Sequence, residues 1–407
     1  MRGQEPDHVP LWNLWRNLDI PFRYRTQTER AEAVLGLGLD DTLLLQPPLN
    51  KTEHYDVNRV PGIRVRVRRV APDKRSRGIA AIRGEQESED GREGEEGWQG
   101  ERYPLLVKEY ETPAGMLRQV VRETEDWPYG EDVQLFSDHN ISRSIEMPVK
   151  GPQDLACLRY LLGEPAAEQI AAFRQEAARL RRDAQRLGVM LEGGWTALGD
   201  AALWLLGTEG VLLLQMDQPD FVEELLELVC RWEMRRMELL LEEGVEVIVH
   251  SAWYESTDFW TPRNYRQLLK PRLKRMVDLA HQAGALFSYI ITASWQPLID
   301  DLIDLRIDSL IGVDPVQGKA DLGEARRRLG AHMCLWGGIN GALTLGQGTP
   351  GEVRRATEEA VRILGPGGGF VLYAVDQLVK GTPWANVEAM IARWREIGSY
   401  PITEGMR

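Results

Sequence analysis

Residues 245–260 read VEVIVHSAWYESTDFW, and this stretch indicates the fold more clearly than any other part of the chain. Residues 245–249 form a β-branched run, which predicts a strand. The loop that follows is rich in acids and aromatic rings. Thr261-Pro262 then predicts a helix over 263–283, with threonine as the N-cap and proline at the first helical position. The stretch therefore predicts a strand, a loop and a helix in succession.

Glu255 and Asp258 follow the predicted strand and are the first candidates for a functional site. In parallel α/β folds, ligands bind at the carboxyl ends of the strands. The alternative is a surface loop whose carboxylates are solvated and whose rings pack on a neighbouring element.

Length and composition limit the class of protein. A chain of 407 residues suits one large barrel or two ordinary domains, and a net charge of −13 argues against nucleic acid and anionic membranes as partners. No apolar run or leader predicts a membrane span or a signal peptide. The three cysteines are far apart in sequence, which predicts reduced thiols, no disulfide framework and a cytoplasmic protein.

Strand-like runs alternate with helical stretches from Pro152 onward, as in βα units. The six clear runs are 189–192, 245–249, 286–291, 309–313, 333–336 and 370–375. Adding 41–46, with 132–136 as a less clear run, gives eight. The predicted fold is therefore α/β, a (β/α)₈ TIM barrel. Gly367-Gly368-Gly369 precedes a strand, so it is interpreted as a tight turn and not as a phosphate-binding loop.

The N-terminal part predicts an elaboration of this barrel. Residues 11–40 are predicted to be helical, and 63–70, 105–111 and 116–122 predict a β-hairpin or small meander. Residues 73–102 are polar and nearly devoid of apolar side chains, which predicts a disordered insertion. We expect 1–407 to form a single domain.

Residues just after the strands are expected to converge at one mouth of the barrel. They are Glu192, Trp195, His250, Trp253, Tyr254, Glu255, Asp258, Tyr289, Asp314, Asn340, Asp376, Gln377 and Lys380, with Thr196, Thr292 and Gln317 beside them. Carboxylates held close together raise one another's pKa, so at least one could act as a general acid near neutral pH. Each residue also has a purely structural alternative: Asp314 could cap a turn, Asn340 could form hydrogen bonds with the backbone of a loop, and Asp376 could form an ion pair with Lys380.

Metal ligands are sparse in the sequence. His250 is the only histidine near the predicted mouth, and a lone histidine at a strand end is more often a core residue than a ligand. No His/Cys cluster has zinc spacing. We therefore expect no metal site, with Mg²⁺ or Mn²⁺ on Glu192, Glu255 and Asp376 as the alternative.

Several segments between about 190 and 395 resemble the uroporphyrinogen decarboxylase superfamily. They are 194–229, Thr261-Pro262 with Tyr265, Lys270-Pro271 and Lys274, then Gly337-Gly338-Ile339-Asn340 with Leu343, and 367–386 ending in TPWAN. The superfamily contains the decarboxylase and corrinoid- or thiol-linked methyltransferases. The resemblance implies a distorted TIM barrel with its site at the strand ends.

The sequence departs from both branches of that superfamily. The decarboxylase's R-Q-A-G-R-Y signature is absent, although Arg16, Arg23 and Arg25 lie in the corresponding region and could bind a carboxylate. The zinc methyltransferases carry His-x-Cys after one strand and a cysteine after the last. Here the first position is part of FSYIIT (287–292) and the last is Asp376, so a thiolate acceptor on zinc is hard to support.

The resemblance and these departures favour methyl transfer between a small methylated donor and a corrinoid protein, without a zinc-thiolate site. Glu255 or Asp376 would protonate the leaving oxygen, with Tyr289 as a secondary donor. Trp195, Trp253 and Tyr254 would wall off the donor, and Asn340 and Gln377 would orient it.

The alternatives are a porphyrinogen-type decarboxylase with an arginine clamp and a non-catalytic ligand-binding barrel. We expect no tightly bound cofactor, a corrinoid only on a partner protein, and a small-molecule substrate. The oligomeric state, a homodimer included, stays open.

Overall fold

The computed structural model describes residues 5–12, 24–48, 62–71, 101–376, 378 and 381–402, and the structural statements below refer to these residues. The chain forms two compact units. One contains 1–48, 164–202 and 212–407, and the other contains 49–163 and 203–211. The predicted insertion at 73–102 lies almost entirely outside the described residues.

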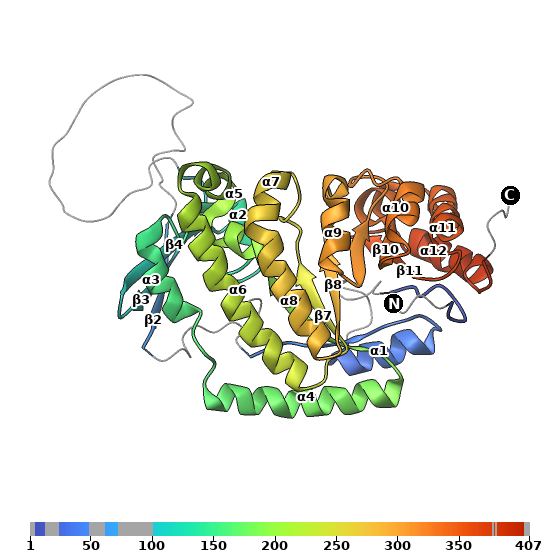
Figure 1. Cartoon of the computed structure of the whole chain (residues 1–407), viewed down its shortest axis with the longest axis horizontal. Helices are drawn as coiled ribbons and strands as arrows, with labels where there is room; N and C mark the ends of the chain where they lie inside the picture. Colours follow the sequence, from blue (N-terminus) through green and yellow to red (C-terminus); the bar gives the residue numbers. More distant parts are fainter. Residues whose placement is uncertain are drawn as a thin grey trace, which may run out of the picture. The chain divides into compact units, whose positions relative to one another are not determined.

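The first unit is built on a parallel sheet in which seven strands are described, in the order β1-β6-β7-β8-β9-β10-β11 (Figure 1). The strands are β1 (Leu43–Leu45), β6 (Leu191–Ala197), β7 (Val247–Ser251), β8 (Leu286–Ile290), β9 (Ser309–Val313), β10 (Cys334–Asn340) and β11 (Phe370–Val375). The α/β class and the parallel sheet are thus confirmed. Closure into an eight-stranded barrel stays a prediction.

Helices connect successive strands, and α6, α8 and α9 lie side by side along the sheet in Figure 1. The helices of this unit are α1 (Gln27–Gly36), α4 (Ala167–Leu187), α6 (Pro219–Glu242), α7 (Pro262–Asn264), α8 (Lys270–Gln282), α9 (Ile299–Leu305), α10 (Leu322–Leu329), α11 (Pro350–Leu364) and α12 (Trp384–Ile397). Helix α5 (Gly199–Asp217), kinked at Gly207, contributes residues to both units. Short 3₁₀ or π segments are η3 (Pro152–Asp154), η4 (Tyr265–Leu269), η5 (Gln296–Leu298) and η6 (Gly341–Leu345).

Local sequence explains where these helices begin. Thr261 accepts a hydrogen bond from the Asn264 N–H, as predicted for an N-cap, and Pro262 is the first helical residue. The predicted helix over 263–283 is divided into α7, the π segment η4 and α8. Thr349 and Glu352 form a reciprocal capping box at the start of α11. No helix in the described ranges is long and apolar enough to cross a membrane.

The two faces of the sheet bury different side chains. Val249, Ile290, Ile311 and Val375 belong to one apolar cluster, which also contains Trp12, Cys334, Trp336, Val371 and Tyr373. Ile248, one residue from Val249, lies instead near Leu240 of α6 on the helix-covered face. Because successive side chains of a strand point to opposite faces, each strand supplies both cores.

A short N-terminal segment pairs with an edge of the sheet. Leu11 forms a parallel bridge with Leu372 of β11, and Trp12 forms one with Asp40, shortly before β1. The prediction of helix over 11–40 was therefore wrong at its start. The helix α1 occupies only Gln27–Gly36.

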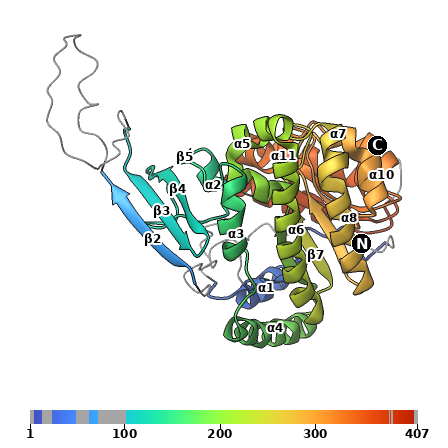
Figure 2. The same ribbon diagram turned by 60° about the vertical axis from the view of Figure 1, so that its left-hand side comes forward.

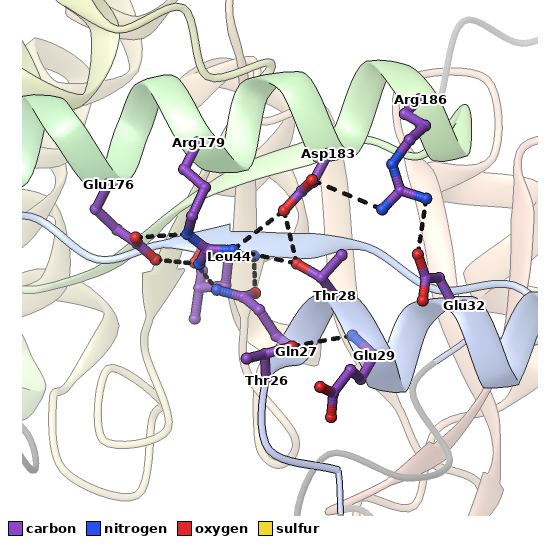
Figure 3. A network of polar contacts seen from close by, with 10 residues as sticks. All are labelled: Thr26, Gln27, Thr28, Glu29, Glu32, Leu44, Glu176, Arg179, Asp183 and Arg186. Carbon is purple, nitrogen blue, oxygen red and sulfur yellow. Dashed lines mark hydrogen bonds and ion pairs between the residues drawn. The ribbon is translucent and has the colours of Figure 1, made fainter.

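Helix α1 is held against α4 and β1 by polar contacts (Figure 3). The Gln27 side chain accepts from the Leu44 N–H at 2.7 Å and donates to the Leu44 carbonyl at 2.9 Å. The Thr28 hydroxyl donates a hydrogen bond to Asp183 at 2.9 Å, and Asp183 also accepts a hydrogen bond from Arg179 at 3.1 Å. These contacts hold β1, at the edge of the sheet, against α1, and hold α1 against α4.

The second unit contains an antiparallel sheet in the order β2-β3-β4-β5, with β2 at one edge (Figure 2). Its strands are β2 (Arg64–Val70), β3 (Leu105–Thr112), β4 (Gly115–Arg122) and β5 (Ser144–Glu146), and its helices are α2 (Asp138–Ile141) and α3 (Leu155–Leu161). The predicted hairpin is confirmed. The strand predicted at 132–136 is wrong, because this segment is irregular. Its buried residues, such as Val133 and Phe136, fill a core without pairing in a sheet.

Candidate functional site

Three polar side chains meet after β9 and β10. The Asn340 amide donates to Asp314 Oδ2 and to Gln317 Oε1, both at 2.8 Å. Asp314 is 1% exposed and also accepts the backbone N–H groups of Val316 (2.8 Å) and Gly318 (3.2 Å). A carboxylate that accepts several hydrogen bonds is held in one orientation. Asp314 therefore supplies a fixed negative charge at this edge of the sheet.

Glycines allow the strand ends to approach one another here. A Cβ at Gly312 would lie 2.3 Å from the Ile291 carbonyl oxygen, and a Cβ at Gly337 would lie 2.3 Å from that of Val313. Both residues also have positive φ, of 120° and 149°, which favours glycine. The close approach brings the ends of β8, β9 and β10 together and so places Asp314 beside Asn340.

Asp376 follows β11 and completes this carboxylate and amide group. Its φ is 60°, an uncommon conformation for a residue other than glycine. Solvent reaches its side chain, yet the surrounding protein removes enough water to raise its pKa. Burial is the larger cause and the negative charge of Asp314 the smaller, and together they raise the pKa of Asp376 to about 6. Asp376 is thus an accessible carboxyl that is protonated at mildly acidic pH.

Two tryptophans lie against the apolar cluster of the sheet. Trp195 of β6 and Trp253, after β7, have ring centroids 5.5 Å apart and planes tilted by 49°. Both rings pack on the cluster that includes Val375, the neighbour of Asp376. The Trp195 Nε1 atom is buried and has no hydrogen-bond partner in the described part of the chain. We call Trp195 and Trp253 the ring pair.

Glu255 lies in a closed hydrogen-bond network instead of beside Asp376. Its carboxylate accepts the Gly199 N–H at 2.7 Å, and it contacts His250 Nε2 at 3.0 Å and the Tyr289 hydroxyl at 2.5 Å. Glu255, His250 and Tyr289 are all 0% exposed. Burial and the charge of Glu255 raise the pKa of Tyr289 well above its usual value. The structure therefore holds Glu255 away from solvent.

Strand alternation explains this separation. His250 and Tyr289 are one position out of phase with Val249 and Ile290, so they point to the helix-covered face. There they stack on each other, with ring centroids 5.4 Å apart, and Tyr265 of η4 lies 3.4 Å from the Tyr289 hydroxyl. The expectation that strand-end residues converge therefore does not hold for these two side chains.

The other predicted residues are scattered. Glu192 is buried within β6, Asp258 is exposed, and Tyr254 is half-buried with its ring edge-on to Phe259. Arg25 is exposed and pairs with Glu29. Gln377, Lys380, Arg23 and Arg16 lie outside the described residues.

Two residues of the Glu255 network, Gly199 and Tyr265, have no clear signal in the sequence, whereas Thr196 was expected beside the strand ends. The Thr196 hydroxyl lies 2.8 Å from His250 Nδ1, Gly199 contributes only its backbone N–H, and Tyr265 comes from the π segment. Glycine after a strand and a tyrosine in a helix are too common to single out. Only the resemblance at 261–274, which includes Tyr265, indicated one of them.

The donor atoms do not suit a zinc-thiolate centre. The cysteines are Cys157 of α3, Cys230 of α6 and Cys334 at the start of β10, and all are buried. Burial raises the pKa of Cys230 to about 11, which opposes thiolate formation. In the described ranges, no three His, Cys, Asp or Glu side chains are grouped to hold a metal ion.

Comparisons with known proteins show what the chain is similar to. A family model described as uroporphyrinogen decarboxylase (URO-D) matches residues 136–397. A methylcobamide:CoM methyltransferase, MtaA, of Methanosarcina barkeri is 22% identical over 221 residues, which cover 53% of this chain and 61% of the relative. A uroporphyrinogen decarboxylase of Coxiella burnetii is 24% identical over 272 residues, covering 64% and 71%. A solved methyltransferase from Methanosarcina mazei aligns with a TM-score of 0.45 at 18% identity, covering 69% of this chain and 73% of that one.

Proposed function

Because the chain belongs to the uroporphyrinogen decarboxylase family, we propose that it transfers a methyl group from a small methylated oxygen compound to a corrinoid protein. Asp376 would be the acid that protonates the leaving oxygen. The observation that carries the proposal is its pKa of about 6 at the end of β11, on a side chain that solvent reaches. An acid with a pKa near the working pH is well suited to proton transfer.

The proton and the methyl group move in opposite directions. The methyl–oxygen bond breaks, the Asp376 carboxyl gives its proton to the oxygen, and the oxygen leaves as water when methanol is the donor or as a phenol when an aryl methyl ether is the donor. A corrinoid carried by the partner would supply the nucleophile that takes the methyl group. Three hydrogen bonds hold the Asp314 carboxylate in place, and burial together with the charge of Asp314 raises the pKa of Asp376, which favours its protonated form before the step.

The ring pair and the amides would bind the donor. Trp195 and Trp253 offer an apolar wall that excludes water, which strengthens the electrostatic effect of nearby charges. The buried Trp195 N–H, which has no partner among the described residues, would donate to an oxygen of the donor. Gln317 is held by Asn340 at the same edge as Asp314 and would orient that oxygen.

The proposal includes no zinc step. Zinc in the methyltransferase branch supplies a thiolate, and the strand-end donors described here are carboxylates and amides. A thiol acceptor is therefore not proposed, although the name of the MtaA relative includes CoM.

The test is a methyl-transfer assay with methanol and simple aryl methyl ethers as donors and free reduced cobalamin as the acceptor. Formation of methylcobalamin is followed by its absorbance. We expect the rate to fall as pH rises above about 6, and Asp376→Asn to lose most of the rate and this pH dependence. Asp217→Asn, an exposed carboxylate of α5, is the matched control. An Asp376→Asn rate equal to that of the wild type would contradict the assignment.

Decarboxylation is the second candidate, and the decarboxylase relative, 71% of which is covered, favours it. Asp376 would then stabilise a cationic pyrrole. The carboxylate clamp would depend on Arg16 and Arg23, since Arg25 is exposed and paired with Glu29. Release of carbon dioxide from uroporphyrinogen, with no methyl transfer to cobalamin, would favour this candidate over the first.

A further inference from the structure

We propose that Glu255 is a positioning residue that fixes the geometry of the ring pair. It does so by joining the segment after β6 to the segment after β7 through one buried carboxylate. The inference goes beyond the proposed function, since it concerns the rings themselves and holds for any substrate that they bind.

The first connection runs to the Trp195 side. Glu255 accepts the N–H of Gly199, the first residue of α5, four positions after Trp195. A Cβ at Gly199 would lie 2.6 Å from Glu255 Cγ, so only glycine leaves room for this contact. The carboxylate therefore fixes where the chain turns from β6 into α5.

A second connection reaches the neighbour of Trp195. His250 contacts Glu255 through Nε2 at 3.0 Å and the Thr196 hydroxyl through Nδ1 at 2.8 Å. Thr196 directly follows Trp195 in β6. Two separate contacts thus connect Glu255 to Thr196 and Gly199, one and four positions after Trp195.

The Trp253 side is connected through the backbone. The Glu255 N–H donates to the Ala252 carbonyl at 3.1 Å, and the Ala252 N–H donates to the Ile290 carbonyl at 2.9 Å. Trp253 lies inside this turn. The side chain of Glu255 and its backbone therefore fix the two rings relative to each other.

Replacing Glu255 by glutamine tests the carboxylate with little change in size. The Gly199 N–H and the Tyr289 hydroxyl donate to Glu255, and His250 Nε2 donates to it when protonated there. The new amide NH₂ can be accepted only if the Tyr289 hydroxyl or His250 Nε2 reverses its role from donor to acceptor, so the network must rearrange. A role limited to stability would lower the unfolding free energy but leave the rings in place in the folded protein.

The experiment measures the optical coupling of the two rings. Two indoles held at a fixed tilt at this distance couple and give a paired band in far-UV circular dichroism. The contribution of the pair is the wild-type spectrum minus that of Trp253→Phe. The same difference is then taken in a Glu255→Gln background, under conditions where all four proteins are folded.

We expect the pair signal to lose most of its amplitude in the Glu255→Gln background. In an Asp301→Asn background it should be retained, because Asp301 is a buried carboxylate that pairs with Arg266 and Lys270 on the outer helices. An undiminished signal in folded Glu255→Gln would overturn the proposal. If that variant does not fold, Thr196→Val cuts the second connection, and a pair signal equal to the wild type's there would overturn it equally. Because no substrate is used, failure of the methyl-transfer assay does not affect this result.

Discussion

The charge of Asp314, after β9, raises the pKa of Asp376, after β11, in addition to the effect of burial. Asp314 is anchored by Asn340 and by backbone N–H groups, whereas Asp376 is reached by solvent. The two carboxyl groups therefore have different surroundings, and the pKa of Asp376 is raised. An accessible carboxyl whose pKa is raised by burial and by a neighbouring charge is a candidate general acid.

This pair predicts how stability depends on pH. The pKa of Asp376 rises from 3.8 to about 6 on folding, so the native state binds the proton more tightly. Between these two values, the contribution of Asp376 to the free energy of unfolding falls as pH rises. Asp376→Asn lacks this loss, so it should gain stability relative to the wild type as pH rises through the window. Urea titrations at several pH values measure the difference, and an identical pH dependence of both proteins would argue against the shift.

The Glu255 network predicts two graded losses of stability. Glu255→Ala leaves His250, Tyr289 and the Gly199 N–H buried without their partner, and should cost about 3 kcal/mol or more. Tyr289→Phe removes a single donor and should cost about 1 to 3 kcal/mol. Urea unfolding at neutral pH compares the two. A Tyr289→Phe loss as large as that of Glu255→Ala would mean that the hydroxyl, and not the carboxylate, organises the network.

The approach of β10 to β9 predicts a strong effect of an added methyl group. Gly337→Ala would place Cβ 2.3 Å from the Val313 carbonyl oxygen at positive φ, and should cost roughly 2 to 4 kcal/mol. Gly284 has positive φ but nothing within 4 Å of its Cβ position, so Gly284→Ala should cost only about 1 kcal/mol. Thermal unfolding of the two variants separates the clash from the backbone conformation. Equal losses of stability in the two variants would show that β9 and β10 move apart at no cost and that the predicted clash does not matter.

Contacts of α1 in Figure 3 predict two different responses to salt. Arg179→Met removes ion pairs with Glu176 and Asp183 at a partly exposed site, and should cost less than about 1 kcal/mol, decreasing further in high salt. Gln27→Ala leaves the Leu44 backbone without its side-chain partner and should cost about 1 to 3 kcal/mol at any ionic strength. The measurement is urea unfolding at low and high salt. A salt-dependent Gln27→Ala loss would contradict the assignment.

Strands with a buried β-branched run were predictable from the sequence. The bounds of β9 and β11 agree with the predicted 309–313 and 370–375. The runs predicted at 189–192 and 333–336 both begin and end too early. They end too early because Gly193 and Gly194 continue β6, and Gly337 and Gly338 continue β10, although glycine has low strand propensity.

The site was only partly predictable, because strand ends indicate position along a strand but not which face a side chain takes. Asp314, Asn340 and Asp376 do lie at one edge. His250 and Tyr289 occupy the opposite face, and Glu255 folds back onto Gly199, 56 residues earlier. Such a contact depends on the path of two separate loops, which local sequence does not specify.

The pairing of the N-terminal segment has a consequence for synthesis of the protein. Val9 donates to the Gly398 carbonyl, the Leu372 N–H donates to the Pro10 carbonyl, and Tyr400 donates to Asp7. Residues 7–12 are made long before these partners, which follow about 360 to 390 residues later in the chain. Until then the segment and the free edge of β11 both carry unpaired backbone groups, of the kind that invites pairing with other chains. This edge of the sheet therefore becomes paired only when two segments far apart in the chain are both present.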